Sequence, residues 1–162
     1  MNHPLLGRVV QLGFVVRDAD AAVARYEATV SLGPWSVYVL RPPLLRDRRY
    51  RGQPGEFAMK IALATDASGL TYELIEPLAG PSVYQDFLSE RGEGLHHIGC
   101  ERTRSLGETV DAFRRAGVEV CMSGRWGEIA FAYLAAEKNL GVCVEVWDVP
   151  ANYELPEDAR VR

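Results

Sequence analysis

The sequence of 162 residues has no long apolar run and no excess of positive charge. A helix that crosses a bilayer needs roughly 20 consecutive apolar residues, and no stretch of this chain approaches that length. We therefore expect no membrane partner. The formal net charge is −4, whereas a general nucleic-acid-binding protein normally presents a basic face. We therefore expect no nucleic-acid partner either.

Cysteine is scarce, and the usual marks of secretion are missing. The three cysteines (Cys100, Cys121 and Cys143) include no Cys-x-x-Cys pair, so a thiolate zinc site is not expected. Each lies among apolar residues, which is typical of reduced thiols in a cytoplasmic protein. The opening residues, MNHPLLGRVVQ, lack the basic start, apolar run and cleavage site of a signal peptide. We expect a cytoplasmic location.

What is present is one pattern that occurs twice. Residues 9–16 (VVQLGFVV) predict a buried strand, Asp18 is a helix N-cap, and apolar residues then recur at helical spacing as far as Val30. Three strand-like segments follow, at 35–40, 56–64 and 70–78. The first half therefore reads as a strand, a helix and three strands.

The second half repeats this order. Residues 96–101 (HHIGCE) are strand-like, and Ser105 forms a capping box with Glu108 at the start of a helix that Gly117 ends. Three more strand-like segments follow, at 118–123, 127–135 and 141–149. Between the halves we expect a linking helix with Ser82 as its N-cap and Gln85 completing a second capping box.

Repeated units of this kind cannot bury their apolar faces alone, so the halves should pack together. We expect an α+β fold in which two βαβββ modules, related by a pseudo-twofold axis, form curled mixed sheets around a cavity, with helices outside. The chain of 162 residues is then one domain. Its expected parts are module 1 at about 7–78, the linking helix at about 81–91, module 2 at about 94–149 and a tail at 150–162.

Alternation along the strands separates an outer face from an inner one, because successive side chains point to opposite faces. In the first strand of each half the apolar side chains share one face, and a polar side chain, Gln11 or His97, lies on the other. The last strand of each half turns one glutamate, Glu73 or Glu145, toward that same inner face. Each module therefore directs one polar residue and one carboxylate into a common interior.

With this pattern the chain resembles the vicinal oxygen chelate superfamily, which includes glyoxalase I, methylmalonyl-CoA epimerase, extradiol dioxygenases and bleomycin- or fosfomycin-resistance proteins. The resemblance runs from about Val9 to Val149 and rests on four segments in this order: QLGFVVRDADAAVARY, YELIEPL, GLHHIGC and LGVCVEVWD. The run from YELIEPL through the linking helix to GLHHIG is most similar to the epimerase and glyoxalase branch.

The resemblance implies a metal site. In this superfamily each module gives one ligand from its first strand and one from its last, and the matching residues here are Gln11, Glu73, His97 and Glu145. His97 matches because it directly precedes IG, while His96 is expected to cap the strand edge or line the pocket. One imidazole, one amide and two carboxylates suit a single divalent ion of Zn, Ni, Co, Mn or Fe, and the sequence does not say which.

The implied ligand set also implies a reaction. Four protein ligands around an octahedral ion leave two neighbouring positions for a substrate with two adjacent oxygens. The ion would polarise a carbonyl, and Glu73 or Glu145 would remove the adjacent proton as general base. We expect a metal-dependent isomerase, epimerase or lyase that acts through an enolate on a small carbonyl, 2-oxo or acyl-thioester substrate.

Lys60 is a third candidate catalytic residue. Methylmalonyl-CoA epimerases carry a glutamate base on the strand that matches FAMKIALA, and the matching position in this chain is Lys60. A lysine there is either a base with a lowered pKa, a contact for an anion, or an ordinary surface residue.

The segment RPPLLRDRRYRGQPG (41–55) makes the first half longer than the second. It contains five arginines: Arg41, Arg46, Arg48, Arg49 and Arg51. One interpretation is a lid that meets an anionic small-molecule substrate. The other is a solvated loop or a contact within a dimer, and we expect the protein to be a homodimer.

Two further functions stay open on the same fold. A metal-free small-molecule-binding or drug-sequestering protein needs the cavity alone, and aromatic side chains are available to line one: Trp35, Trp126, Trp147, Tyr38 and Tyr133. A metal-dependent dioxygenase or group transferase is the other, but ring-cleaving members bind iron with two histidines and a carboxylate. Gln11 in place of one histidine disfavours that chemistry.

Glu76 is expected to be solvated, and Cys143 to be a buried inert thiol.

Overall fold

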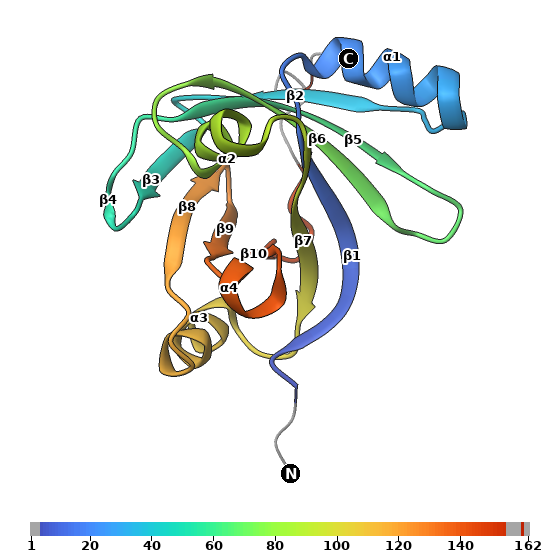
Figure 1. Ribbon diagram of the computed structural model, residues 1–162. Helices are drawn as coiled ribbons and strands as arrows, with labels where there is room; N and C mark the ends of the chain where they lie inside the picture. Colours follow the sequence, from blue (N-terminus) through green and yellow to red (C-terminus); the bar gives the residue numbers. More distant parts are fainter. Residues whose placement is uncertain (1–3, 155–159, 161–162) are drawn as a thin grey trace.

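The computed structural model describes residues 4–154 and residue 160. A single curled sheet forms most of it (Figure 1), with the strand order β2-β5-β6-β1-β7-β10-β9-β8-β3-β4. The first half comprises β1 (Leu6–Val15), α1 (Ala19–Val30), β2 (Ser36–Leu40), β3 (Leu45–Tyr50), β4 (Gln53–Pro54), β5 (Ala58–Thr65) and β6 (Thr71–Ala79). Next come α2 (Val83–Arg91), β7 (Gly94–Arg102), α3 (Leu106–Arg115), β8 (Val120–Trp126), β9 (Ile129–Leu134), α4 (Glu137–Leu140) and β10 (Cys143–Asp148). Within the described ranges, no helix is long and apolar enough to cross a membrane.

The pairing of the strands repeats between the halves. β1 runs parallel to β6, and β7 runs parallel to β10. β1 and β7 pair antiparallel to each other and so join the halves at the middle of the sheet. The predicted α+β fold with two βαβββ modules about a pseudo-twofold axis is confirmed.

The outer face of the sheet is covered by one helix on each half, α1 on the first and α3 on the second (Figure 1). Phe14 and Leu74 pack in the apolar cluster beneath α1. Ile98 and Val144 pack in the matching cluster beneath α3. Alternation in the sequence predicted this outer face correctly, and the polar residues between these positions are therefore left for the inner face.

A third cluster fills the concave side and belongs to both halves. It contains Val15 and Ile75 from the first half, Met122 and Phe131 from the second, and Tyr84 from α2. The linking helix therefore packs into the interior rather than outside it. Because one core holds residues from both halves, neither half has a complete interior of its own.

The helix starts follow the sequence signals. The side chain of Asp18 accepts a hydrogen bond from the backbone of Ala21, and Ser105 and Glu108 form the reciprocal capping box at α3. At α2, Ser82 accepts from the backbone of Gln85, but no return bond from the Gln85 side chain accompanies it. The second predicted capping box is therefore only half present.

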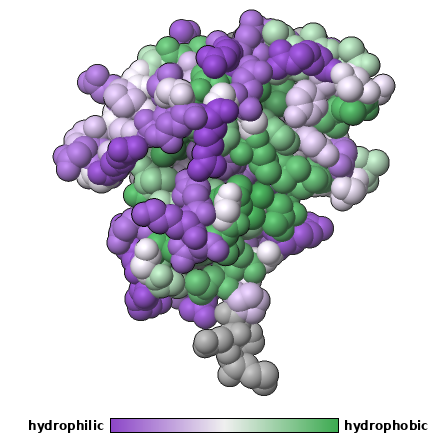
Figure 2. Space-filling model, viewed as in Figure 1, coloured by the Kyte–Doolittle hydropathy of each residue, from purple (hydrophilic) through white to green (hydrophobic). Residues whose placement is uncertain are grey.

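The arginine-rich segment 41–55 is not a loop. Most of it forms β3 and β4, and β3 pairs antiparallel with β8 at the far edge of the second half. Leu45, at the start of β3, is almost fully buried in the inner cluster, so an apolar residue anchors the hairpin despite its charge. The hairpin extends the sheet and forms a hydrophilic projection at the left of Figure 2.

Candidate metal centre and its pocket

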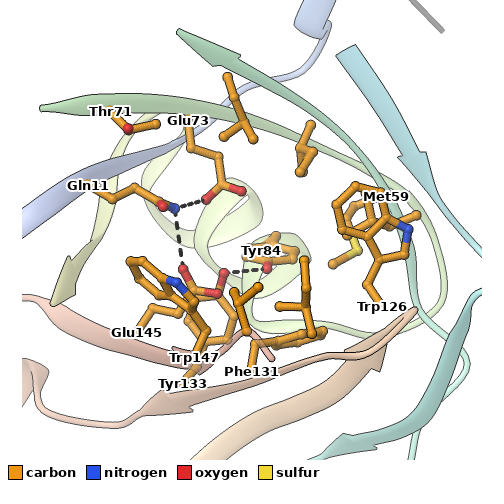
Figure 3. Close-up of a pocket in the computed structure, with 15 residues that line it drawn as sticks. Gln11, Met59, Thr71, Glu73, Tyr84, Trp126, Phe131, Tyr133, Glu145 and Trp147 are labelled. Carbon is orange, nitrogen blue, oxygen red and sulfur yellow. Dashed lines mark hydrogen bonds between the residues drawn. The ribbon is translucent and has the colours of Figure 1, made fainter. Parts of the chain in front are cut away.

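The four residues predicted as metal ligands come from the four central strands of the sheet. Gln11 lies on β1, Glu73 on β6, His97 on β7 and Glu145 on β10, and these strands are neighbours in the order β6-β1-β7-β10. Gln11, Glu73 and Glu145 point toward one another on the inner face (Figure 3). The pseudo-twofold axis therefore brings together two residues from each half.

His97 lies against both glutamates and is fully buried. Its Nε2 atom is 3.3 Å from Oε2 of Glu73 and 3.3 Å from Oε2 of Glu145. One potential ligand atom from each of these three residues lies within 4.8 Å of the other two. Both glutamates are less than a tenth exposed. The three side chains form a compact buried group that is rich in acceptor atoms.

The Gln11 amide bridges the two carboxylates. Its nitrogen donates to Glu73 Oε2 at 2.7 Å and to Glu145 Oε2 at 3.3 Å. An amide carries a donor and an acceptor at nearly equivalent positions, so turning it over would present its oxygen to the same point. Gln11 therefore supports the carboxylates in the metal-free state and has an oxygen available for a cation.

Two glycines make room for this group, and their positions repeat between the halves. Gly13 is paired with His97 across the β1–β7 register, and Gly99 is paired with Gln11. A Cβ atom on Gly13 would lie 1.8 Å from the His97 ring. A Cβ atom on Gly99 would lie 2.8 Å from Cβ of Gln11 and 2.6 Å from the Trp147 ring. Sequence reasoning missed both glycines, although the shared spacing of QLG and HIG is a signal for them.

His96 lies in a second layer and does not line the pocket. It is buried between the rings of Tyr84 and Phe87, with centroids 5.5 and 5.2 Å away. Its Nδ1 atom is 3.1 Å from Nδ1 of His97. Burial lowers the pKa of His96 to about 3, so its ring is neutral and can accept a hydrogen bond from His97. That bond fixes the orientation of the His97 ring, so that Nε2 faces the glutamates.

The pKa values of His97 and Glu73 reflect how closely these charges are packed. Burial lowers the pKa of His97, but Glu145 and Glu73 outweigh burial and raise it to about 9. Burial raises the pKa of Glu73, and His97 offsets part of that effect. In the metal-free protein at neutral pH, a proton on His97 therefore offsets part of the negative charge of the group.

The same residues fit a divalent ion. Among the described residues, the buried Nε2 atom of His97 has no partner at good hydrogen-bond geometry, although it lies 3.3 Å from both carboxylates. An imidazole nitrogen and two carboxylates form a donor set that Zn²⁺ and the neighbouring divalent transition metals accept. Glu73, His97 and Glu145 therefore form a group able to hold one such ion, and the Gln11 oxygen is a candidate fourth ligand.

The group lies at one end of a pocket of about 280 Å³. The pocket is lined by Gln11, Leu40, Met59, Ile61, Leu63, Thr71, Glu73, Tyr84, Trp126, Ile129, Phe131, Tyr133, Glu145, Trp147 and Val149. Three of the aromatic residues named from the sequence line this pocket: Trp126, Trp147 and Tyr133. Tyr38 packs against Trp126, with 5.1 Å between the two ring centroids. Trp35 was wrongly expected there, because it packs in the outer cluster beneath α1.

Tyr84 is a further pocket residue that the sequence did not reveal. It comes from α2, and its hydroxyl donates to that of Tyr133 at 2.7 Å. Burial raises the pKa of both phenols well above the ordinary value, so both stay neutral. A lone tyrosine near the start of a helix gives no signal of its role, since only the packing of α2 turns it inward.

Lys60 is not brought to the site. On β5 the inward positions are those of Met59 and Ile61, which line the pocket, while Lys60 points to the outer face and pairs with Asp20 of α1. Its expected role as a base or anion contact is therefore withdrawn.

Glu76 shares that outer face, but it is not simply solvated, because it accepts a hydrogen bond from the first backbone amide of α1 at 2.9 Å.

None of the arginines of segment 41–55 lines the pocket. Arg46 pairs with Glu128 at 2.7 Å, and Arg51 pairs with Asp86 at 2.8 Å. Arg48 donates to the backbone oxygen of Phe57 at 2.9 Å. These contacts fasten the hairpin to its surroundings, so it is not an open lid.

Known proteins match this architecture. Residues 10–133 match the family model of the Glyoxalase/Bleomycin resistance protein/Dioxygenase superfamily. Methylmalonyl-CoA epimerase from Mycobacterium tuberculosis is similar in structure, with a TM-score of 0.64, 21% identity and 93% of each chain covered.

Two further solved structures have a comparable likeness. A hypothetical protein from Bacillus halodurans has a TM-score of 0.62 and 24% identity, over 91% of this chain and 98% of that one. Methylmalonyl-CoA epimerase from Streptomyces coelicolor, in complex with 2-nitronate-propionyl-CoA, has a TM-score of 0.60 and 24% identity, over 90% of this chain and 99% of that one. No curated protein matches the sequence.

The family match covers most of the chain and includes Gln11, Glu73 and His97. It agrees with the duplicated strand order, with the site at the junction of the two halves and with the folds of the solved structures. The chain belongs to the Glyoxalase/Bleomycin resistance protein/Dioxygenase superfamily.

Proposed function

We propose that the protein is an isomerase, epimerase or lyase that uses one divalent metal ion and acts through an enolate on a small carbonyl, 2-oxo or acyl-thioester compound. One observation carries this proposal. Three ligand groups, from Glu73, His97 and Glu145, lie within 4.8 Å of one another at the buried end of a pocket. A protein that only sequesters an apolar molecule has no use for two buried carboxylates, which are expensive to desolvate.

A divalent ion held by these residues would supply Lewis acidity to a substrate carbonyl and so make the adjacent C–H more acidic. His97 would be the neutral ligand, held in orientation by the hydrogen bond between Nδ1 and His96. Gln11 would turn its amide over to offer its oxygen as a further ligand, in place of the two hydrogen bonds that its nitrogen donates in the metal-free protein. The apolar wall of the pocket would keep water from the reacting carbon.

The two glutamates are the candidates for general base. Each has one carboxylate oxygen directed at the group and lies at the end of the pocket where a substrate would be held. A carboxylate in that position can take the α-proton and return it, and such help is typically worth ~10²–10⁴-fold in rate. Lys60 has no part in this proposal, because it faces Asp20 on the other side of the sheet.

The test is exchange of the α-proton with solvent. Protein loaded in turn with Zn²⁺, Ni²⁺, Co²⁺ or Mn²⁺ is incubated in D₂O with 2-oxo, 2-hydroxy-ketone and acyl-thioester compounds, and exchange is followed by NMR. We expect metal-dependent exchange with at least one class, and loss of that exchange in Glu73→Gln or Glu145→Gln even when metal is restored. Failure of all four metals to bind would instead favour the metal-free sequestering function on the same fold.

A further inference from the structure

The pocket has two ends of very different character. Gln11, Glu73 and Glu145 lie together at one end, and Trp126 and Met59 lie at the other (Figure 3). Between and around them the wall is apolar or aromatic, from Leu40, Met59, Ile61, Leu63, Trp126, Ile129, Phe131, Trp147 and Val149. A ligand that places two oxygens against the polar end must therefore put the rest of its structure mainly among apolar and aromatic side chains.

No cationic side chain among the described residues lines this pocket. Three arginines of segment 41–55 are engaged outside the pocket: Arg46 with Glu128, Arg48 with a backbone oxygen and Arg51 with Asp86. Arg41 is exposed and does not line the pocket. An anionic group on the body of a ligand would lose its hydration in the pocket and find no opposite charge there, which is strongly unfavourable.

The polar end does not attract an anion either. A divalent ion on Glu73 and Glu145 has its two charges balanced by the two carboxylates, so the loaded centre carries no net positive charge to draw in further anions. The volume, about 280 Å³, is near the lower end of the range for small-molecule sites. The volume of the pocket and its lack of cationic side chains together favour a substrate that is small and uncharged away from its two oxygens.

We infer that the substrate is an uncharged 2-hydroxy ketone or 1,2-dicarbonyl compound with an aromatic or branched apolar substituent. This inference rests on the proposed function for its two adjacent oxygens and adds the chemistry of the remaining body. It differs from what the two solved epimerases are named for, since a methylmalonyl-CoA substrate is anionic. The anionic substrate was one of two interpretations of the arginine-rich segment 41–55, and a neutral substrate takes its place.

The experiment compares two ligands that differ only in charge at the distal end. The probes are 2-hydroxyacetophenone and its 4-carboxylate, titrated into the full chain loaded with Zn²⁺, with binding measured by calorimetry. Because an unpaired charge is costly in an apolar wall, the neutral compound should bind at least roughly tenfold more tightly. Equal binding, tighter binding of the carboxylate, or no binding of either compound would overturn the inference.

The same samples separate this inference from the proposed function. Exchange of the CH₂ protons of 2-hydroxyacetophenone in D₂O reports on enolate formation and is independent of the affinity measurement. Binding with the expected preference but no exchange, across all the metals, would leave the substrate class standing and overturn the enolate chemistry. Exchange confined to the carboxylate would support the enolate chemistry and overturn the substrate class.

A substitution at the aromatic end tests the physical reason. Ile129 is partly exposed, lines the pocket and is paired with Trp126 across the β8–β9 hairpin. In Ile129→Lys, the ratio of the two affinities should fall by roughly fivefold. The lysine would pair with the carboxylate of the charged probe, and a solvent-accessible ion pair is worth up to about that factor. The matched control Ile129→Gln adds polarity without charge and should narrow the preference less than Ile129→Lys does. An unchanged preference in Ile129→Lys would contradict the inference, because charge would then not be what excludes the carboxylate.

Discussion

At the scale of the residue, the site depends as much on missing side chains as on present ones. The His97 ring occupies the space that a side chain at Gly13 would need, and Gln11 lies beside Gly99 in the same way. The chemistry of the group also depends on what lies behind it. His96 is held neutral by burial, which keeps it available as an acceptor for His97.

The first prediction concerns this space. Gly13→Ala would place a Cβ atom 1.8 Å from the His97 ring, so the ring must move away from the glutamates. We expect metal affinity to fall by roughly 10–100-fold, as when the supporting contacts of a metal ligand are lost. Calorimetric titration with Zn²⁺ measures it.

The control for that prediction is Gly107→Ala. Gly107 lies in α3, and a Cβ atom there would meet nothing within 4 Å. The change should leave metal binding intact and raise stability by about 0.5–1 kcal/mol, because alanine loses less backbone entropy in a helix. Wild-type metal affinity in Gly13→Ala would show that the close packing of His97 is unimportant.

A second prediction follows from the pKa of His97. In the folded metal-free protein that pKa is about 9, above the ordinary value of 6.5. Protonated His97 therefore contributes stability that is complete below pH 6.5 and is lost as the pH rises through about 9. The raised pKa of Glu73 acts in the same direction at lower pH.

The measurement is the melting temperature in the presence of a chelator between pH 6 and pH 10. We expect it to fall as the pH rises, and we expect the fall to be smaller with Zn²⁺ bound, because the ion takes the place of the proton. A metal-free protein that becomes more stable between pH 7 and pH 9 would contradict the assignment of the raised pKa to His97.

At the scale of the element, the helix starts are well specified by sequence, while the edges of the sheet are not. Local signals such as the Ser105–Glu108 box act within four residues and can be read from the chain alone. The pairing of β3 with β8 could not, because it joins distant segments and β3 is rich in arginine. Charged residues indicate only that a segment is exposed to solvent on at least one side. An edge strand is exposed in this way as much as a loop is, so charge does not distinguish the two.

The prediction at this scale concerns the start of α3. Ser105→Ala removes the side chain that accepts from the Glu108 backbone, and should cost about 1 kcal/mol of stability. Ser105→Thr keeps an acceptor and should cost less. Chemical denaturation of both variants measures the difference, and equal stability of Ser105→Ala and the wild type would show that the box contributes nothing.

The candidate site was predictable only where alternation governed the assignment. Gln11, Glu73, His97 and Glu145 were placed on the inner face by period-two alternation, and the structure brings them together. Lys60 was chosen by matching a family position without applying the same alternation, which places it with the outer residues of β5. Tyr84 was beyond reach, since its position depends on how α2 packs against both halves.

At the scale of the whole molecule, the two halves form one body. The sheet is continuous through β1 and β7, and the inner cluster takes residues from both halves. The candidate ligands lie on both sides of this junction, so a bound ion would fasten the halves together. The expectations of a homodimer and a cytoplasmic location stay predictions.

The whole-molecule prediction is a single unfolding transition that metal shifts upward. Because the core is shared, near-ultraviolet and far-ultraviolet circular dichroism should give coincident melting curves. Zn²⁺ at about 100 times its Kd should add about 2.7 kcal/mol, or roughly 5–10 °C for a chain of this size. Two separate transitions, or a metal effect on only one signal, would show that the halves unfold independently.

The equivalence of the two first strands also bears on ancestry. In β1 and in β7, a candidate ligand is followed by one intervening residue and then by a glycine. The β1–β7 register places each ligand opposite the glycine of the other strand. Glu73 is paired with Gly13, and Glu145 is paired with Gly99. A half-length chain would hold half of this set, and two identical copies about a twofold axis would complete it. The present chain is what fusion of such copies would leave once one first-strand ligand had become Gln11 and the other His97. Gln11→His would make the two first-strand ligands identical and needs a single nucleotide change. The added imidazole should shift the metal preference toward Zn²⁺ over Mn²⁺, which a competition titration measures.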